Sequence, residues 1–348
     1  FFFKQKTAYE IYQCDWSSDV CSSDLSGSPV PLTVTAGGAA SFTLTGLADG
    51  TAGASQTVTV TAKDSSNNTV TSYTGTKSLT FSGANVAPAG TAPTVAGTAV
   101  GSATTVTFSN GVGRMAFVPY KAETVTLAAT DGTVSGTASA VTITAASAAS
   151  SQTTLAASPT SVAVSGTATV TVTVKDAYGN TRTAAAASEF AAAVTTSTYT
   201  NTTAGTLGSF TCTTGVCTAT YTAPTTTGTV GLTTTIGGTA VSGSPVTLTV
   251  TAGGVSASMS TVSTSATSVI ADGSATATIT VTLKDASSNV ISGKTVGLTP
   301  GSGTSTITTV SGTTDALGQA TFTVKASAAQ SVLYTATVDG IPITQTVT

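Results

Sequence analysis

The sequence predicts an all-β protein built from β-sandwich domains in tandem. Thr, Ser, Ala, Gly and Val dominate its 348 residues, and only 7% of the residues are charged. Apolar residues alternate with Thr or Ser over short runs, which is the period of a strand with one buried face. A strand-and-turn pattern also recurs at intervals of 112 and 109 residues, measured between Asp64, Asp176 and Asp285. No stretch shows the 3.6-residue apolar period of a helix.

The composition also excludes several classes of protein. Eleven Lys and Arg against fourteen Asp and Glu give a net charge of −3, which is too little positive charge for a nucleic-acid-binding surface. The many β-branched residues are unlike those of a disordered chain. No apolar run has the length of a membrane-spanning helix, so we expect no membrane segment in this chain.

Residues 1–25 differ from the rest of the chain. They hold the only Trp, Cys14 and Cys21, and they lack the apolar core and cleavage site of a signal peptide. Back-translation of residues 14–25, CDWSSDVCSSDL, gives DNA that resembles a short-read sequencing adapter, and residues 3–11 resemble its flow-cell end. We therefore interpret residues 1–25 as a non-native, disordered leader and leave them out of the fold prediction.

The first repeated landmark is a strand that runs into Lys-Asp and a polar turn. Its three copies are VTVTAKDSSNNTV (58–70), VTVTVKDAYGNTR (170–182) and ITVTLKDASSNVI (279–291). Asp, Asn and Gly favour turns over strands, so each strand should end at its Lys-Asp pair. We interpret each Lys as a surface residue and each Asp as a turn-forming one.

Two further landmarks recur in phase with the first. A strand at 124–130, 229–236 or 332–338 leads into a pair that suits a tight primed hairpin turn: Asp131-Gly132, Gly237-Gly238 or Asp339-Gly340. Another alternating strand precedes each of these, at 114–120, 217–223 and 319–326. Short strands with a turn every 8–12 residues are typical of an immunoglobulin-like Greek-key sandwich.

These landmarks predict three immunoglobulin-like domains at 37–146, 150–254 and 256–348. The segment SGSPVPLTVTAGG (26–38) equals SGSPVTLTVTAGG (242–254) except that Pro31 replaces Thr247. We therefore interpret residues 26–36 as the orphan last strand of a truncated upstream repeat. The sequence is expected to be a fragment of a longer array.

Residues 256–348 resemble the bacterial Ig-like domains of the invasin/intimin type. The matching segments are ADGSATATITVTLKD (271–285), TTDALGQATFTV (313–324) and the closing hairpin at Asp339-Gly340. Residues 152–252 look like a more distant version, and residues 39–146 are the most divergent. The resemblance implies tandem sandwiches, beads on a string, on cell-surface adhesins. It carries over no catalytic residue.

Cys212 and Cys217 flank the turn of a predicted hairpin, TCTTGVC. Residues opposite one another on paired strands lie within disulfide range, so we predict a structural Cys212–Cys217 disulfide. A zinc site would need two further ligands, and C-x4-C is not a thioredoxin-type spacing. A disulfide indicates an oxidising, extracellular environment.

No catalytic, cofactor-binding or metal site is predicted. The absence of His rules out Ser-His-Asp and Cys-His catalysis. The segments that join the domains, 144–154 and 251–259, contain no acid, which argues against calcium-stiffened joints. Tyr178, in the loop Asp-Ala-Tyr-Gly-Asn, is the best candidate for an exposed sugar-stacking ring.

The predicted function is therefore structural and non-enzymatic. We expect a spacer or stalk of a bacterial cell-surface or secreted adhesin, whose repeats contact their neighbours in the chain and hold a distal binding domain away from the cell. The alternatives are a module that itself binds a glycan or a host or surface protein, within a larger secreted protein or hydrolase, and a phage virion decoration domain. No cofactor is expected.

Overall fold

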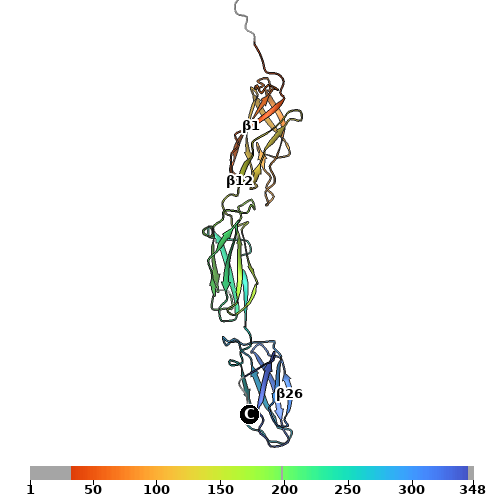
Figure 1. Ribbon diagram of the computed structural model, residues 1–348, viewed down its shortest axis with the longest axis vertical. Helices are drawn as coiled ribbons and strands as arrows, with labels where there is room; N and C mark the ends of the chain where they lie inside the picture. The colour runs from red at the N-terminus through yellow and green to blue at the C-terminus, as the bar shows by residue number, and fades with distance from the viewer. Residues whose placement is uncertain (1–32, 197–198, 344–348) are drawn as a thin grey trace, which may run out of the picture.

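The structure, a computed structural model, describes residues 33–196 and 199–343. The predicted leader, 1–25, and most of the predicted orphan strand, 26–36, lie outside the described residues. Three domains follow one another along the long axis of the molecule (Figure 1). Each has its own cluster of buried side chains, which run from Phe42 to Ile143, from Leu155 to Val250 and from Val262 to Ile343. We call them domains 1, 2 and 3.

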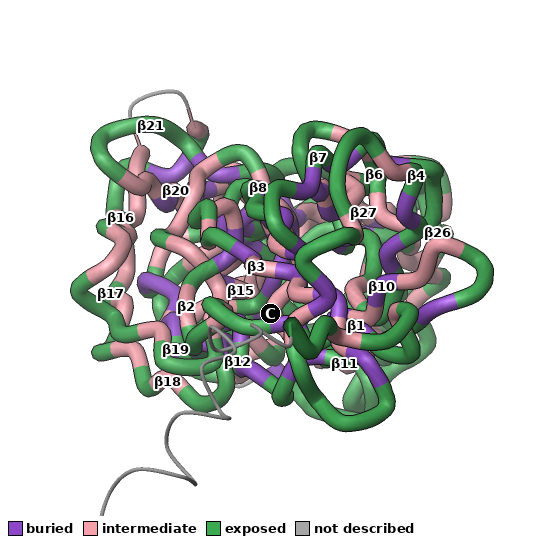
Figure 2. The backbone as a smooth tube through the Cα atoms, turned by 90° about the horizontal axis from the view of Figure 1, so that it is seen from above, coloured by how far each residue is buried: buried purple, intermediate pink, exposed green. Residues whose placement is uncertain are grey.

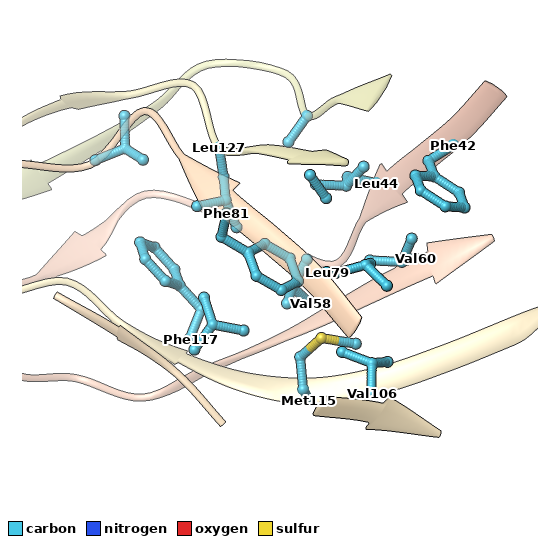
Figure 3. Packing of buried hydrophobic residues seen from close by; sticks show 14 of the residues in the cluster. Phe42, Leu44, Val58, Val60, Leu79, Phe81, Val106, Met115, Phe117 and Leu127 are labelled. Atoms are coloured by element: carbon cyan, nitrogen blue, oxygen red, sulfur yellow. The ribbon is translucent and has the colours of Figure 1, made fainter. Parts of the chain in front are cut away.

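Domain 1 consists of short strands whose buried residues alternate with exposed ones. The strands are β1 (Ser41–Thr45), β2 (Gly50–Thr51), β3 (Gln56–Lys63), β4 (Gly75–Ser82), β5 (Thr94–Val95), β6 (Thr98–Ala99), β7 (Ala103–Ser109), β8 (Val112–Val118), β9 (Glu123–Val125), β10 (Ala128–Thr130), β11 (Ser135–Thr137) and β12 (Val141–Thr144). The larger sheet has the order β1-β3-β8-β7-β4-β10-β11, and β2-β12-β9 form the smaller one. Phe81, Phe117 and Leu127 fill the space between them and are fully buried (Figure 3).

Domain 2 shows the two-sheet sandwich most simply. Its elements are β13 (Thr154–Ser158), β14 (Ser161–Ala163), β15 (Thr167–Thr173), the 3-10 turn η1 (Ala187–Glu189), β16 (Ala191–Thr195), β17 (Thr206–Leu207), β18 (Thr211–Thr213), β19 (Val216–Thr222), β20 (Gly228–Ile236), β21 (Thr239–Ala240) and β22 (Val246–Thr251). One sheet has the order β13-β15-β19-β17 and the other β14-β22-β20-β16. The first strand crosses between sheets, because β13 pairs antiparallel with β15 whereas β14 pairs parallel with β22.

Domain 3 repeats this plan with fewer strands. They are β23 (Thr261–Thr264), β24 (Ala277–Thr282), β25 (Val296–Pro300), β26 (Thr306–Ser311), β27 (Gln319–Lys325), β28 (Tyr334–Val338) and β29 (Ile341–Pro342). The sheets are β23-β24-β27-β26 and β25-β28-β29. Seen along the long axis, buried residues lie towards the inside and exposed ones on the outer loops (Figure 2). The all-β, tandem-sandwich prediction is confirmed.

The predicted turns are right in two domains and wrong in one. Gly237-Gly238 and Asp339-Gly340 have positive φ at both residues, as a primed hairpin turn requires. At Asp131-Gly132 only the glycine has positive φ, because the Asp131 carboxylate instead accepts hydrogen bonds from Thr133 N and Val134 N. The loop is therefore wider than a two-residue turn.

The strand predicted at 124–130 is divided in two. β9 pairs with β12 in the smaller sheet, and β10 pairs with β4 in the larger one. The chain crosses between the sheets at Thr126, whose carbonyl lies so close to Gly83 that a side chain at residue 83 would overlap it. Such a crossing depends on the tertiary contact and leaves no mark in the alternation of residues.

Candidate functional site: the joints between the domains

The Lys-Asp loops of the three repeats lie at the N-terminal end of each domain and share one geometry. In each loop the Asp Oδ1 accepts two main-chain hydrogen bonds, from the residues two and four positions later. The distances are 3.0 and 2.8 Å for Asp64, 2.9 and 2.9 Å for Asp176, and 2.9 and 2.9 Å for Asp285. The predicted turn-forming role of the Asp is present in all three.

The second carboxylate oxygen of each Asp binds the segment that enters the domain. Asp64 Oδ2 accepts from Gly37 N at 3.1 Å, Asp176 Oδ2 from Ala146 N at 2.9 Å, and Asp285 Oδ2 from Gly253 N at 2.9 Å. The carboxylate thus ties the linker to the loop. These Asp residues are buried, with exposed fractions of 7%, 0% and 1%, which a turn-forming role alone does not require.

An Asn four residues after the Asp completes each loop. Its Nδ2 donates to the Asp Oδ2, at 3.1 Å from Asn68, 2.8 Å from Asn180 and 2.8 Å from Asn289. Each carboxylate therefore accepts four hydrogen bonds, which offset the cost of burying its charge. At Asp64 the bonds from Asn68 lower the carboxyl pKa most strongly. At Asp285 burial raises the pKa, but the bonds led by that from Gly253 outweigh it and leave the pKa lowered.

The same Asn reaches into the preceding domain. Asn180 Nδ2 donates to Tyr120 O at 2.8 Å, and Asn180 Oδ1 accepts from Ala122 N at 2.9 Å. Asn289 Nδ2 donates to Thr225 O at 2.8 Å, and its Oδ1 accepts from Thr227 N at 3.4 Å. An Asn amide has two N–H donors, and here one holds the carboxylate and the other holds the neighbouring domain.

The joint between domains 1 and 2 has contacts that the second joint does not share. The Tyr178 ring packs on Tyr120 with centroids 4.9 Å apart, Tyr178 O accepts from Ala89 N at 2.9 Å, and the ring also lies against Gly53. Arg182 donates to Ala146 O while it pairs with Glu189 at 2.6 Å. At the corresponding positions domain 3 has Ser287, which is exposed, and Ile291, which is buried. Tyr178 is therefore half-buried in a joint, and its assignment as an exposed sugar-stacking ring is wrong.

Both joints contain a carboxylate, although the joining segments 144–154 and 251–259 have no acidic residue. The linkers themselves carry none, but each receives a carboxylate from the Lys-Asp loop of the following domain. In all three repeats an Asn follows the Asp by four residues, and this spacing is the feature of the sequence that marks the joint. Within the described residues no group of three or more His, Cys, Asp or Glu side chains is placed to hold a metal ion.

The predicted disulfide is present. Cys212 in β18 faces Cys217 in β19 as a directly paired residue, with Cα atoms 3.9 Å apart. Cys217 is fully buried in the core of domain 2, so the bond fixes strand β18 to that core. A pocket of about 580 Å³ in domain 3 is lined by residues 266–271 and 328–332 among others. No helix in the part of the chain that the structure describes is long and apolar enough to cross a membrane.

Comparison with known families covers the last of the three domains. Residues 259–348 match the bacterial Ig-like domain (group 1) family. Domain 3 is thus similar to bacterial Ig-like domains. No curated protein sequence matches the chain.

Solved structures extend the likeness beyond domain 3 to most of the chain. The Escherichia coli adhesin FdeC is 25% identical, with 90% of this chain and 98% of that chain covered and a TM-score of 0.59. Invasin, a bacterial integrin-binding protein, is 22% identical and covers 87% of this chain, with a TM-score of 0.53. This chain spans 58% of the invasin structure, and the likeness to invasin concerns the fold. The predicted resemblance to invasin-type bacterial Ig-like domains is confirmed.

Proposed function

We propose that the chain is a stalk segment of a bacterial surface or secreted adhesin, and that it acts as a spacer rather than as an enzyme. The observation that carries this proposal is the repeated joint, in which one Asp and one Asn bind both the linker and the preceding domain. A flexible string of domains would not need a buried carboxylate at each linker. The joint therefore favours a chain whose domains keep their order along an axis.

The length of the molecule follows from the strands. A strand of about ten residues spans roughly 33 Å, so three domains placed end to end approach ~100 Å. On this proposal the units are the segments 37–146, 150–254 and 256–348, each with its own core and contacts only to its neighbours. The threonine-rich outer faces keep these domains soluble with little charge.

The likeness to FdeC and invasin supports an adhesin, and we place the chain outside the cell on that basis. The disulfide supports the same location, because such bonds persist in oxidising environments. The partners of each domain are then its neighbouring Ig-like domains, and a host or surface ligand binds elsewhere in the whole protein.

Binding assays on the full chain test the spacer role. The chain is applied to a glycan array and to cultured host cells. The binding domain of an established adhesin, applied in the same way, serves as the positive control. A spacer shows no binding above background in either assay. Saturable binding of this chain to a glycan or to cells would overturn the spacer role and identify a binding module instead.

A further inference from the structure

The N-terminal end of domain 1 carries the same Asp-Asn loop as the two joints, but the Asn of this loop is exposed. Asn180 is 3% exposed and Asn289 is half-buried, whereas Asn68 is exposed. Within residues 33–196 and 199–343, the Asn68 side chain bonds only to Asp64, at 3.1 Å. One Nδ2 hydrogen and the Oδ1 acceptor, which hold the preceding domain at the other two loops, thus meet no described residue.

The loop is nevertheless assembled as fully as the others. Asp64 accepts from Ser66 N, Asn68 N and Gly37 N, and it is 7% exposed. The linker contact is the same as in the second joint, because Gly37 occupies the place of Gly253 in the matching segments 26–38 and 242–254. The half of the joint that domain 1 contributes is therefore complete.

The residues around this loop indicate which kind of domain it fits. Where the first joint has Tyr178, domain 1 has Ser66 and domain 3 has Ser287. The segment that leads into the second joint contains β22, the last strand of domain 2, and residues 26–38 repeat that segment with one difference. Both sides of the loop thus resemble the joint between domains 2 and 3.

The hydrogen bonds at the two joints define which groups a partner of Asn68 must present. In both joints the Asn donates to a main-chain carbonyl and accepts from the main-chain N–H two residues later, at Tyr120 and Ala122 or at Thr225 and Thr227. Both pairs lie in the loop that follows a central strand, after β8 and after β19. The partner must present such a pair at the C-terminal end of a sandwich.

We propose that the Asp64–Asn68 loop is a half-joint that binds the C-terminal end of a further Ig-like domain of the domain 2 type. Asn68 Nδ2 donates to a carbonyl of that domain's central loop, and Asn68 Oδ1 accepts from the N–H two residues later. This inference extends the proposed stalk beyond the three domains, and it names the partner at that end.

An extended chain tests the proposal. Residues 147–254 are placed directly before residue 39, in place of residues 1–38, so that a second copy of domain 2 precedes domain 1 through its own linker. Selective [15N]asparagine labelling then follows hydrogen exchange of the side-chain amides in the parent and extended chains. The Asn68 signals are assigned by their loss in Asn68→Asp.

The Asn68 amide is expected to exchange roughly fivefold more slowly in the extended chain, as one added hydrogen bond of about 1 kcal/mol implies. Asn67→Gly, which changes the exposed neighbour and keeps its positive φ, should leave this slowing intact. An unchanged Asn68 rate, with Asn180 and Asn289 slow in both chains, would overturn the half-joint and leave the stalk standing. Fast exchange at Asn180 and Asn289 would instead count against the stalk.

Discussion

Asn180 in domain 2 donates a hydrogen bond from Nδ2 to the main-chain oxygen of Tyr120 in domain 1, 2.8 Å away. The same Nδ2 holds Asp176 Oδ2 at 2.8 Å, and Asp176 Oδ2 also holds the linker at Ala146. One amide and one carboxylate therefore connect three segments of chain: the loop, the linker and the preceding domain. Asn289 and Asp285 do the same between domains 2 and 3.

Replacement of the bridging amide should free one domain from its neighbour. Asn180→Ala removes two hydrogen bonds between domains 1 and 2, worth about 1 kcal/mol each. In residual dipolar couplings, domains 1 and 2 should share one alignment tensor in the parent chain and take different tensors in the variant. Asn110→Gly, at an exposed turn with positive φ, is the matched control, and it should preserve the shared tensor.

The buried carboxylate should matter more for stability than an exposed one with the same turn geometry. Asp176→Ala removes four hydrogen bonds at a fully buried site and should cost domain 2 about 3 kcal/mol of unfolding free energy. Asp315 accepts from Leu317 N and Gln319 N at 2.9 Å but is exposed. Asp315→Ala should cost domain 3 about 1 kcal/mol or less. Hydrogen exchange of the core strands measures each domain separately, and equal costs would contradict the joint role of Asp176.

Acid should weaken the joint at domain 3. Hydrogen bonds hold the pKa of Asp285 below its ordinary value near 3.8, despite the opposing effect of burial. A group with a lowered folded-state pKa stabilises the protein above its unfolded pKa and ceases to do so as pH falls through the folded value. Domain 3 should therefore keep its full stability above about pH 5 and lose part of it below about pH 4.

Thermal unfolding of the parent and of Asp285→Asn between pH 2 and pH 7 checks this expectation. The variant lacks the titrating carboxylate, so its stability should depend less steeply on pH below 4. Identical slopes in the two proteins would show that other carboxyl groups cause the acid sensitivity.

The contact between Tyr120 and Tyr178 should make the joint between domains 1 and 2 open less often than the joint between domains 2 and 3. Tyr178→Ser gives domain 2 the residue that domain 3 has at position 287, and it removes a ring pair worth roughly 0.5–1.5 kcal/mol beyond its buried area. Elastase cuts after small residues, which both linkers contain. Its cleavage within 144–154 should be faster in Tyr178→Ser, while cleavage within 251–259 stays unchanged and serves as the internal control.

Reduction of the disulfide should destabilise domain 2 alone. A cross-link that closes a loop of about six residues contributes roughly 2 kcal/mol in the chain-entropy account. Addition of dithiothreitol should lower the free energy of unfolding of domain 2 by that amount and leave domains 1 and 3 unchanged. A shift of all three domains on reduction would contradict the assignment of the stabilising effect of the disulfide to domain 2 alone.

The fold and the disulfide could be predicted because their signals are local. Alternation along β15 and β24 shows which face is buried, and the spacing of Cys212 and Cys217 around a turn places them opposite one another. The joint could not be predicted in the same way. Asp176 meets Ala146 thirty residues before it, and Asn180 meets Tyr120 sixty residues before it, so neither contact has a local pattern.

The residues of the joint were nevertheless visible in the repeat. The sequence predicts that Asp64, Asp176 and Asp285 form turns, which they do. Their burial and their hydrogen bonds to the linkers appear only in the structure. The polar loop around Tyr178 predicts an exposed ring, whereas domain 1 covers this loop in the structure. A residue at the end of a domain takes its environment from the neighbouring domain as well as from its own.

Small-angle X-ray scattering of the parent chain beside the double variant Asn180→Ala/Asn289→Ala tests the stalk most directly. The parent chain should have a maximum dimension of ~100 Å or more with the scattering profile of a rod. The double variant should retain folded domains but show the profile of a flexible chain with a shorter mean dimension. Superimposable profiles from the two proteins, or a compact parent, would contradict the claim that these asparagines hold the domains in line.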